Sequence, residues 1–444
     1  MYQSFGIADN LLTDMDFYDT LSEYLSPEMV SSLRESEAKK GLKGVLLNHH
    51  KLSDAVFLEK FPKLLPHPHV PHAYLYDAEE YELGKSYLYE GGAISIEDPA
   101  AMLPFYFLKP EKDDLILDMC AAPGGKSIGL SLSSDMESTI VSNDISYARA
   151  KRLSSNIERM GLGNVVVTSG DFSICHENFK ERFDKILLDA PCSGSAMFRK
   201  NPLAKEDWSL QKVLSLAKKQ YELLEVAFDM LKPGGKLMYS TCSFSNQEDD
   251  ELLLSFLANH PDARPIELPD HPGFYHHHSL PHGIHLFPHL YPGEGQYLCL
   301  LGKNGESEKG FPSNRSERKY QSFLSEYGLD SRDNRVINGA LYSLNHAVDT
   351  TGLSLLRYGL KCLEEGPHPL PDHHLSHYLG NESSIPLSAK QAEAYLTGES
   401  FKIEGGNGIH ILSYEGLNLG FGKTVDGVLK NHYPKGLRKK MEIE

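Results

Sequence analysis

Five short apolar runs, each followed by a helical pattern, occupy residues 113–260 and constrain the fold more than any other feature of the chain. The runs are DDLILDMC, STIVSND, NVVVTSGD, FDKILLDA and GGKLMYST. Runs this short and this rich in leucine and β-branched residues are typical of buried parallel strands. Helical patterns lie between them, among them SYARAKRLSSNIERM and the long KEDWSLQKVLSLAKKQYELLEVAFDML. The alternation predicts a doubly wound α/β domain.

Local signals define the ends of two helices. The long helix should stop at Lys232-Pro233-Gly234-Gly235, because proline and glycine break helical structure. After the fifth run, Ser245-Asn-Gln-Glu248 has the spacing of a capping box. It predicts that Ser245 opens the helix DDELLLSFLANH.

The flanking regions follow other patterns. Residues 1–103 mix helical runs with the proline- and histidine-rich FPKLLPHPHVPHAY. The polar stretch KNGESEKGFPSNRSERK predicts a linker at residues 304–319. We therefore expect an N-terminal lead-in region at 1–103, the α/β domain at 104–303, this linker, and a separate C-terminal region at 320–444.

Composition limits the class of protein. The chain has 444 residues and 40% hydrophobic content, which supports ordinary globular cores. It has no apolar window long enough to span a membrane, and its N-terminus, MYQSFGIADN, lacks the features of a signal peptide. Six cysteines without paired spacing fit a reducing cytoplasm.

Charge gives a divided signal. The net charge of −17 argues against a nucleic-acid binder. Phosphates respond to a local basic surface, however, and FGKTVDGVLKNHYPKGLRKK provides one. A solvated basic tail is the alternative. The basic residues of this segment are Lys423, Lys430, Lys435, Arg438, Lys439 and Lys440.

A glycine-rich turn, CAAPGGKS, follows the first predicted strand. Such turns bring backbone N–H groups at a helix N-terminus close to a ligand. A phosphate-binding P-loop is disfavoured because Cys120 occupies the position of its first glycine, and the dinucleotide pattern G-x-G-x-x-G is absent. A purely structural turn and a turn around a nucleotide-like ligand without pyrophosphate stay open. In the second case Lys126 would meet a carboxylate of the ligand.

The first three predicted strands each end in an acid, namely Asp118, Asp144 and Asp171. An acid at the tip of the second strand is where a doubly wound fold binds a ribose diol. Asp171 is placed to accept a hydrogen bond from an adenine amino group. Each acid alone is an ordinary turn or capping residue. Together with the Gly-Gly-Lys turn they predict S-adenosylmethionine as the cofactor.

Cysteines follow the next two strands, Cys192 in LLDAPCSGS and Cys242 in MYSTCSFS. Because ligands bind at the carboxyl ends of such strands, both thiols should face one crevice beside Asp189. Two inert core cysteines are the alternative. Metal ligation fits poorly, since no CxxC or histidine spacing accompanies them, and a disulfide is not expected in a reducing compartment.

Methylation of carbon 5 of a pyrimidine is the chemistry that needs a thiol at this place. Carbon 5 is a weak nucleophile, and addition of a thiolate to carbon 6 makes it enamine-like and able to attack a methyl sulfonium. An acid that faces N3 and the amino group would stabilise the charge that develops on the ring. Asp189 is the candidate for that acid. A second cysteine could assist release, in which the C5 proton leaves and the sulfur is expelled.

The blocks LDMCAAPGGKS, DAPCSGS and YSTCSFSNQED together resemble the Nol1/Nop2/Sun family of RNA cytosine-5 methyltransferases. GVLLNHHKLS, GGAISIEDPAAM and LFPHLYPGEGQYLCLL extend the similarity to residues 20–303. The C-terminal blocks LLRYGLKCLEEG, SAKQAEAYLTGE and GFGKTVDGVLKNHYPKGLR resemble the bacterial RsmF type, which modifies 16S ribosomal RNA. The resemblance implies a Rossmann-like methyltransferase core between a mixed N-terminal region and a PUA-like, RNA-binding C-terminal region.

The family's roles carry over to matching positions. The resemblance implies that Cys242 is the nucleophile, that Cys192 assists release and that Asp189 orients the cytosine. DNA cytosine-5 enzymes use a Pro-Cys thiol as the nucleophile, so Cys192 stays a rival for that role. The implied contacts to S-adenosylmethionine are Cys120, Ala121, Ala122, Pro123, Gly124, Gly125, Lys126, Asp144, Arg149, Asp171 and Asp189.

The lead-in departs from the family pattern at two places. Glu97-Asp98-Pro99-Ala100-Ala101 stands where Gln-Glu-Pro-Ser-Ser is usual, and Val45-Leu46-Leu47-Asn48 lacks the usual arginine. RNA contacts or the edge of the donor pocket should therefore differ around residues 45–101. Irregularly spaced histidines in proline-rich loops are expected at the surface or facing RNA, without a metal. They are His67, His69, His72, His276, His277, His278, His282, His285 and His289.

The sequence thus predicts a cytoplasmic, monomeric enzyme without membrane attachment. It would use S-adenosylmethionine to methylate carbon 5 of a cytidine in 16S ribosomal RNA, either as RNA or within the small ribosomal subunit. One alternative is a tRNA cytosine-5 methyltransferase of the same family. Another is a non-catalytic RNA-binding ribosome assembly factor, which the retention of both cysteines and Asp189 disfavours.

Overall fold

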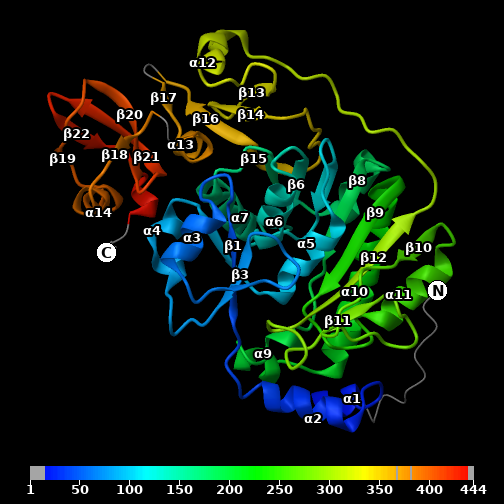
Figure 1. Cartoon of the computed structure of the whole chain (residues 1–444). Helices are drawn as coiled ribbons and strands as arrows, with labels where there is room; N and C mark the ends of the chain where they lie inside the picture. Colours follow the sequence, from blue (N-terminus) through cyan, green and yellow to red (C-terminus); the bar gives the residue numbers. More distant parts are fainter. Residues whose placement is uncertain (1–15, 367–368, 381–382, 439–444) are drawn as a thin grey trace.

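The computed structural model describes residues 16–366, 369–380 and 383–438, and a large mixed sheet lies at its centre (Figure 1). The strand order of this sheet is β10-β12-β9-β8-β5-β6-β7-β15, with β11 paired to β12. The strands from β5 to β9 pair in parallel, and each overlaps one of the predicted apolar runs. The predicted doubly wound core is therefore confirmed. Its parallel strands are β5 (Leu115–Asp118), β6 (Thr139–Asn143), β7 (Val165–Ser169), β8 (Phe183–Asp189) and β9 (Leu231–Thr241).

Antiparallel strands extend this sheet at both edges. On the β9 side, β12 pairs with β9 and carries β10 and β11. On the β7 side, β15 pairs with β7, although β15 comes from the predicted C-terminal region. The sheet therefore combines segments from both sides of the predicted linker at 304–319. These edge strands are β10 (Ala263–Ile266), β11 (Ile284–Leu286), β12 (Gln296–Lys303) and β15 (Ser354–Tyr358).

Both faces of the sheet are covered by helices, as β5 illustrates. Leu115 and Leu117 pack into one buried cluster, whereas Ile116 packs into the cluster on the opposite face. Because successive strand residues point to opposite faces, a strand buried on both sides has to be apolar throughout. The helices around the sheet are α5 (Leu103–Leu108), α6 (Gly125–Ser133), α7 (Tyr147–Met160), α8 (Phe172–Cys175), α9 (Pro202–Glu206), α10 (Leu210–Met230) and α11 (Asp250–Asn259).

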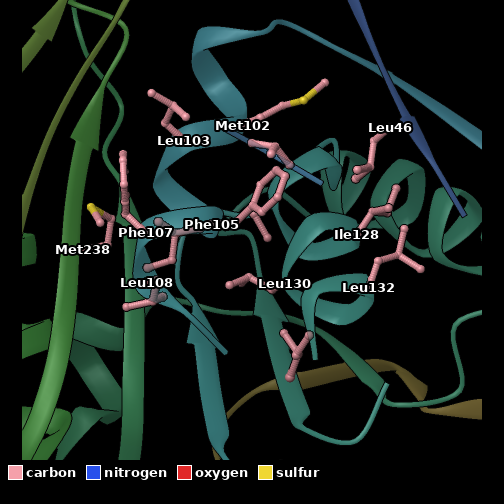
Figure 2. Close-up of a cluster of buried hydrophobic side chains, with 14 of the residues drawn as sticks. Leu46, Met102, Leu103, Phe105, Phe107, Leu108, Ile128, Leu130, Leu132 and Met238 are labelled. Atoms are coloured by element: carbon pink, nitrogen blue, oxygen red, sulfur yellow. The ribbon is translucent and has the colours of Figure 1, made fainter. Parts of the chain in front are cut away.

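Helices α5, α6 and α7 contribute to the cluster that holds Ile116, and α10 and α11 contribute to the other. Figure 2 shows part of the first cluster, with Phe105 of α5 beside Ile128 of α6 and with Phe107 near Met238 of β9. A Cβ atom at Gly129 of α6 would lie 2.4 Å from the ring of Phe105. This close approach seats α5 on α6.

The described part of the N-terminal region forms four α-helices and a small antiparallel sheet of order β2-β3-β1-β4. The helical run predicted near the start of the chain is present as α1 and α2. Leu417 from β21 belongs to the buried cluster of this sheet, so the N- and C-terminal regions share a core. The elements are α1 (Phe17–Leu21), α2 (Pro27–Ser36), β1 (Lys43–Leu47), α3 (Asp54–Lys60), β2 (Leu65–Pro66), β3 (Ala73–Tyr76), α4 (Tyr87–Glu90) and β4 (Ile94–Glu97).

The C-terminal region contains two further sheets, of order β13-β14-β16-β17 and β18-β20-β21-β22-β19. The second sheet, drawn in orange and red, lies beside the blue N-terminal sheet (Figure 1). Within the described residues, no helix has the length and apolar character needed to cross a membrane. The elements are α12 (Gln321–Glu326), β13 (Asp333–Ile337), β14 (Ala340–Leu344), β16 (Leu360–Glu364), β17 (Leu370–Pro371), α13 (His373–Tyr378), β18 (Ile385–Pro386), α14 (Ala389–Thr397), β19 (Phe401–Lys402), β20 (Gly408–Tyr414), β21 (Leu417–Val425) and β22 (Val428–Asn431).

The expected capping box at Ser245 is wrong. Helix α11 begins only at Asp250, and its N-cap, Asp249, makes no side-chain capping bond. The Glu248 carboxylate accepts hydrogen bonds from Ser193, Ser243 and Gln220 instead. Buried donors from other elements thus hold the side chain that a capping box would need.

Strand β15 is fastened to the core by the buried guanidinium of Arg357. Its Nε donates to Ser154 Oγ at 3.0 Å and its Nη1 to His374 Nδ1 at 2.5 Å, and Nη2 pairs with the Glu158 carboxylate. Burial lowers the pKa of His374 well below its ordinary value, so a neutral imidazole accepts the bond. One side chain therefore joins β15, α7 and α13.

Arg357→Ala should lower the free energy of unfolding by about 3 kcal/mol, because it leaves the Glu158 carboxylate without its buried partner. Urea denaturation followed by circular dichroism measures the change. Lys319→Ala, which removes an exposed ion pair with Glu365, is the control and should have little effect. Equal losses in the two variants would contradict a fastening role for Arg357.

Candidate active site

A cavity of about 570 Å³ opens where the parallel strands of the central sheet end. Segments that follow β5, β6, β7, β8 and β9 line it, and one face of α10 completes the wall. Doubly wound sheets bind their ligands at this edge. The lining residues are Met119, Cys120, Ala122, Asn143, Asp144, Ile145, Arg149, Gly170, Asp171, Phe172, Ser173, Asp189, Ala190, Pro191, Cys192, Lys219, Glu222, Leu223, Val226 and Cys242.

The structure divides the predicted site residues into two groups. Both cysteines line the cavity, together with Cys120, Ala122, Asp144, Arg149, Asp171 and Asp189. Ala121, Pro123, Gly124, Gly125 and Lys126 belong to the turn behind it and are not lining residues. The sequence therefore located the cavity, but five of the predicted residues belong to the turn at the start of α6 and do not line it.

The two glycines of the turn have structural reasons to be glycine. Gly124 has φ +115° and precedes α6, a conformation that L side chains rarely adopt. A Cβ atom on Gly125 would lie 2.0 Å from the Glu97 carboxylate of β4. Glu97, the first residue of the departure from the family pattern, thus lies against the glycine turn, and none of residues 97–101 lines the cavity.

Asp144 lines the cavity at the end of β6. Its Oδ1 accepts from the Ser146 backbone N–H at 2.9 Å, and its Oδ2 lies 3.4 Å from Arg149 Nη2. Arg149 also donates to the Ala122 carbonyl at 2.7 Å. Asp144 is 2% exposed, so a ligand would reach it only from inside the cavity.

Asp171 lines the cavity at the end of β7 and caps the short helix α8. Its Oδ1 accepts from the backbone N–H of Ser173 at 3.0 Å and from the Ser173 hydroxyl at 2.7 Å. The third predicted acid, Asp118, is fully buried and accepts from Ser127 Oγ at 2.6 Å. Burial raises the pKa of Asp118 to about 7. Two of the three strand-end acids face the cavity, and Asp118 supports α6 instead.

Apolar side chains complete the fit to S-adenosylmethionine. Ile145 follows Asp144 and is 61% exposed, which is unusual for an isoleucine that lines a cavity. Phe172 follows Asp171, and Leu223 and Val226 of α10 face the same space. An adenine ring can lie against such walls, with the acids in reach of its amino group and of a ribose diol. The residues present therefore fit the methyl donor.

Asp189 ends β8 and is held by three hydrogen bonds. Its Oδ2 accepts from Lys126 Nζ at 2.8 Å, and its Oδ1 accepts from Ser240 Oγ at 2.7 Å and Gln296 Nε2 at 3.0 Å. Burial alone would lower the pKa of the Lys126 ammonium, but the Asp189 carboxylate raises it, so Lys126 keeps its charge. We expected Lys126 to meet a carboxylate of the ligand, and the carboxylate that it meets is Asp189.

The two predicted thiols lie together. The Sγ atoms of Cys192 and Cys242 are 3.2 Å apart, and β8 and β9 are paired so that Asp189 stands opposite Ser240. The hydrogen bond with Cys242 and burial raise the pKa of Cys192 well above its ordinary value. Cys192 therefore stays a thiol at neutral pH, and only a thiolate is a good nucleophile. Burial, more than the nearby acids, raises the pKa of the third lining cysteine, Cys120, to about 12.

Sequence reasoning missed more than half of the lining residues. Four of them lie on α10 with the spacing of a single helix face, and this signal could have been recognised within the long apolar helix. Others are the immediate neighbours of predicted residues along the strand ends. The missed residues are Met119, Asn143, Ile145, Gly170, Phe172, Ser173, Ala190, Pro191, Lys219, Glu222, Leu223 and Val226.

The histidine clusters lie outside this lining. Among the described residues, two groups could offer three ligands to a metal, His49 with His50 and Asp135, and His176 with Glu177 and Asp229. Neither includes a histidine that the sequence analysis considered. Several of those histidines hydrogen-bond within the fold, among them His67 with the Pro99 carbonyl at 3.0 Å and His285 with Asp250 at 2.8 Å. His67, His277 and His285 are buried, so their expected place at the surface is wrong.

Comparison with known proteins agrees with this geometry. A family model described as 16S rRNA methyltransferase RsmB/F matches residues 105–302, and one described as the methyltransferase RsmF PUA domain matches residues 382–439. Ribosomal RNA small subunit methyltransferase F of Vibrio cholerae serotype O1 is 30% identical over 431 residues, which cover 89% of this chain and 91% of that protein. The chain belongs to the RsmB/F family of 16S rRNA methyltransferases.

Further relatives and solved structures support the family assignment. The Shewanella woodyi protein of the same name is 31% identical over 405 residues, covering 81% of each chain. A methyltransferase homolog protein from Pyrococcus horikoshii has a TM-score of 0.56 and 25% identity, over 64% of this chain and 93% of that one. NSun6 from Pyrococcus horikoshii with SFG has a TM-score of 0.60 at 18% identity, over 66% of this chain and 98% of that one, and so shares the fold. The predicted family, fold class and S-adenosylmethionine dependence are confirmed.

Asp144→Ala and Asp171→Ala should each weaken S-adenosylmethionine binding by about 1–3 kcal/mol, roughly 5- to 150-fold in Kd, through loss of hydrogen bonds to ribose or adenine. Titration calorimetry with the full chain measures this. Glu177→Ala, an exposed acid outside the cavity lining, is the matched control. Unchanged affinity in both aspartate variants would exclude them from the donor site.

Proposed function

We propose that this RsmB/F-family chain transfers the methyl group of S-adenosylmethionine to carbon 5 of a cytidine in 16S ribosomal RNA. The observation that carries the proposal is the 3.2 Å separation of the Cys192 and Cys242 sulfurs, beside Asp189 and inside the donor cavity. A site for methylation of an exocyclic nitrogen needs no thiol. Two thiols at one crevice match a reaction in which a C6–sulfur bond forms and later breaks.

Cys242 is proposed as the nucleophile. Its sulfur adds to C6 of the cytosine, and the ring electrons move to C5, which then attacks the methyl group. S-adenosylmethionine supplies that methyl group as an electrophilic sulfonium. Cys192 is the weaker candidate for attack, because its raised pKa keeps it protonated.

Cys192 is proposed to assist release. In that step a base takes the C5 proton, the C5–C6 double bond re-forms, and the C6–sulfur electrons return to Cys242. A Cys192 thiol that donates a hydrogen bond across 3.2 Å stabilises the departing Cys242 thiolate. The two cysteines therefore have different roles although they share one crevice.

Asp189 is proposed to orient the cytosine. A carboxylate has about four acceptor positions, and Lys126, Ser240 and Gln296 occupy three of them. The remaining position can accept from the cytosine amino group. The Lys126 ammonium beside it holds the carboxylate in place without contributing to the cavity lining.

The C-terminal sheet is proposed to dock the RNA. Lys423 of β21 and Lys430 of β22 are exposed and stand directly opposite each other in the strand register. Like charges at such positions destabilise a sheet, so a functional reason is expected. A phosphate backbone lying across them would neutralise both. Lys435 and Arg438 are also exposed, whereas Lys439 and Lys440 lie outside the described residues.

The chain is further proposed to act as a monomer in the cytoplasm, on ribosomal RNA or on the small ribosomal subunit. Family membership supports the 16S substrate. The matched PUA model supports RNA contact through residues 382–439.

The two cysteine assignments differ in what accumulates. Cys242→Ala should be inactive and form no covalent bond to RNA, because the nucleophile is gone. Cys192→Ala should allow addition and methyl transfer but stall elimination, and so trap a protein–RNA adduct. Denaturing gel electrophoresis with labelled RNA detects it. An adduct with Cys242→Ala alone would reverse the assignment, and full activity in both variants would reject the thiol mechanism.

The same variants identify the RNA when returned to a deletion strain. Bisulfite sequencing of total RNA should show one or more unmodified cytidines in 16S ribosomal RNA of the deletion strain, restored by the wild-type chain and not by Cys242→Ala. Loss at a tRNA position instead would favour the tRNA alternative. No loss in any RNA would favour an assembly factor without catalysis.

Lys423→Ala combined with Lys430→Ala should weaken RNA binding. The slope of log affinity against log salt should fall in magnitude by about 1.5–2. Each phosphate contact that forms on binding releases slightly less than one counterion, and this variant loses two such contacts. Filter binding from low to high salt measures the slope. The control is Lys63→Ala with Lys85→Ala, two exposed lysines that pair with Glu80 and Glu82. An unchanged slope in the first variant would make the basic residues a solubility feature.

A further inference from the structure

One buried carboxylate joins the two loops that carry the thiols. Glu248 Oε1 accepts from the Ser193 backbone N–H at 2.8 Å, and its Oε2 accepts from the hydroxyls of Ser193 and Ser243, both at 2.5 Å. Ser193 directly follows Cys192, and Ser243 directly follows Cys242. A single side chain is thus bonded to the residue next to each thiol.

The rest of the network holds Glu248 in turn. Gln220 of α10 donates from Nε2 both to Glu248 Oε1 at 2.9 Å and to the Pro191 carbonyl at 3.0 Å. The Tyr239 hydroxyl of β9 donates to the Glu248 backbone carbonyl at 2.7 Å. Glu248, Gln220 and Tyr239 are each 0% exposed. The network therefore ties both loops to two rigid elements, α10 and β9.

Such a carboxylate is costly to bury without donors. Burial raises the pKa of Glu248, and the hydrogen bonds from Ser193, Ser243 and Gln220 offset part of that rise. Helix α11 does not need the side chain, because it begins at Asp250 with Asp249 as its N-cap. The contacts that remain to explain a buried acid here are those with the two thiol loops.

We propose that Glu248 is a positioning residue of the methyl-transfer site, which holds the loops of Cys192 and Cys242 so that the two sulfurs stay in contact. The proposal rests on the function proposed above. The hydrogen bonds of the Glu248 side chain run to residues 193, 220 and 243, and none runs to a cysteine sulfur, so these bonds act on the two thiols through the loops that carry them. Displacement of a reacting group by about 1 Å can cost about 100-fold in rate, so such a constraint has a measurable effect.

Two substitutions separate geometry from charge. In Glu248→Gln, the amide oxygen can keep the two obligate donors, the Ser193 N–H and the Gln220 amide, while the amide nitrogen donates to the two serine hydroxyls, which can also accept. The network then persists without the negative charge. Glu248→Ala removes the carboxylate to which the Ser193, Ser243 and Gln220 donors are bonded.

Glu248→Ala should reduce kcat by about 10- to 100-fold, with the Kd for S-adenosylmethionine unchanged, because the donor pocket is left intact. Glu248→Gln should restore kcat to within a few-fold of wild type. The wild-type chain, the two variants and all controls are assayed in full length with 16S ribosomal RNA as substrate.

A second readout measures the sulfur–sulfur contact directly. Diamide oxidises two adjacent thiols to a disulfide and is itself reduced to a hydrazine by taking up two electrons and two protons. Mass spectrometry of peptides should find the Cys192–Cys242 link forming quickly in wild type and Glu248→Gln, and at least tenfold more slowly in Glu248→Ala.

Asp250→Asn is the matched control. Asp250 is equally buried two residues away, but its partners are Tyr297 and His285, which lie outside the thiol loops. It should leave the cross-linking rate unchanged. If Glu248→Ala does not fold, Ser243→Ala and Ser193→Ala, which each remove one hydroxyl donor, should show smaller losses of the same two kinds.

The outcomes decide the proposal. Wild-type kcat and cross-linking in Glu248→Ala would overturn it, as would a Glu248→Gln variant as impaired as Glu248→Ala, which would assign the effect to charge. Failure of the proposed function is distinguishable, because then the wild-type chain itself would not methylate RNA and Cys192→Ala would trap no adduct, whatever the cross-linking rates.

Discussion

The parallel pairing of β8 with β9 is the constraint on which the candidate site depends. This register sets Asp189 opposite Ser240 and brings the segments after both strands to one edge of the sheet. From there the two sulfurs come within 3.2 Å although 50 residues separate them along the chain. Neither loop could provide this geometry alone, because each supplies only one thiol. The apolar layers on both faces of the sheet fix the register, and the chemistry is positioned by that packing.

The strand and helix pattern was predictable because the core strands are buried on both faces and their apolar runs are unbroken. The strand-end residues Asp144, Asp171, Cys192 and Cys242 could be located for the same reason, since parallel strands expose their carboxyl ends together. Lys126 was harder, because its partner, Asp189, lies 63 residues further along the chain. Glu248 was misread as part of a capping box, because a local pattern cannot show that distant donors compete for the same carboxylate.

The donor cavity and the thiol crevice share residues but are built differently. The donor side uses strand-end acids and apolar walls, including the exposed Ile145, and is open to a small molecule. The thiol side depends on buried polar networks around Asp189 and Glu248, in which each carboxylate has donors from several segments of the chain. Such networks specify one arrangement because a partly satisfied buried charge is unfavourable. The arrangement suits the proposed reaction, in which one sulfur bonds to carbon 6 and its neighbour assists release.

The antiparallel strand β15 gives the catalytic sheet a dependence on sequence that is synthesised late. Until Ser354–Tyr358 has been made, the β7 edge of the sheet presents unpaired backbone groups, which is the kind of edge on which chains aggregate. On the ribosome, the β7 edge of the methyltransferase sheet is therefore still unpaired when residue 303 emerges. This edge can be paired only after residues 304–353 and then β15 have been synthesised. A newly made enzyme would then complete its catalytic sheet only as its RNA-docking region begins to appear, so a nascent chain cut short before β15 would lack both.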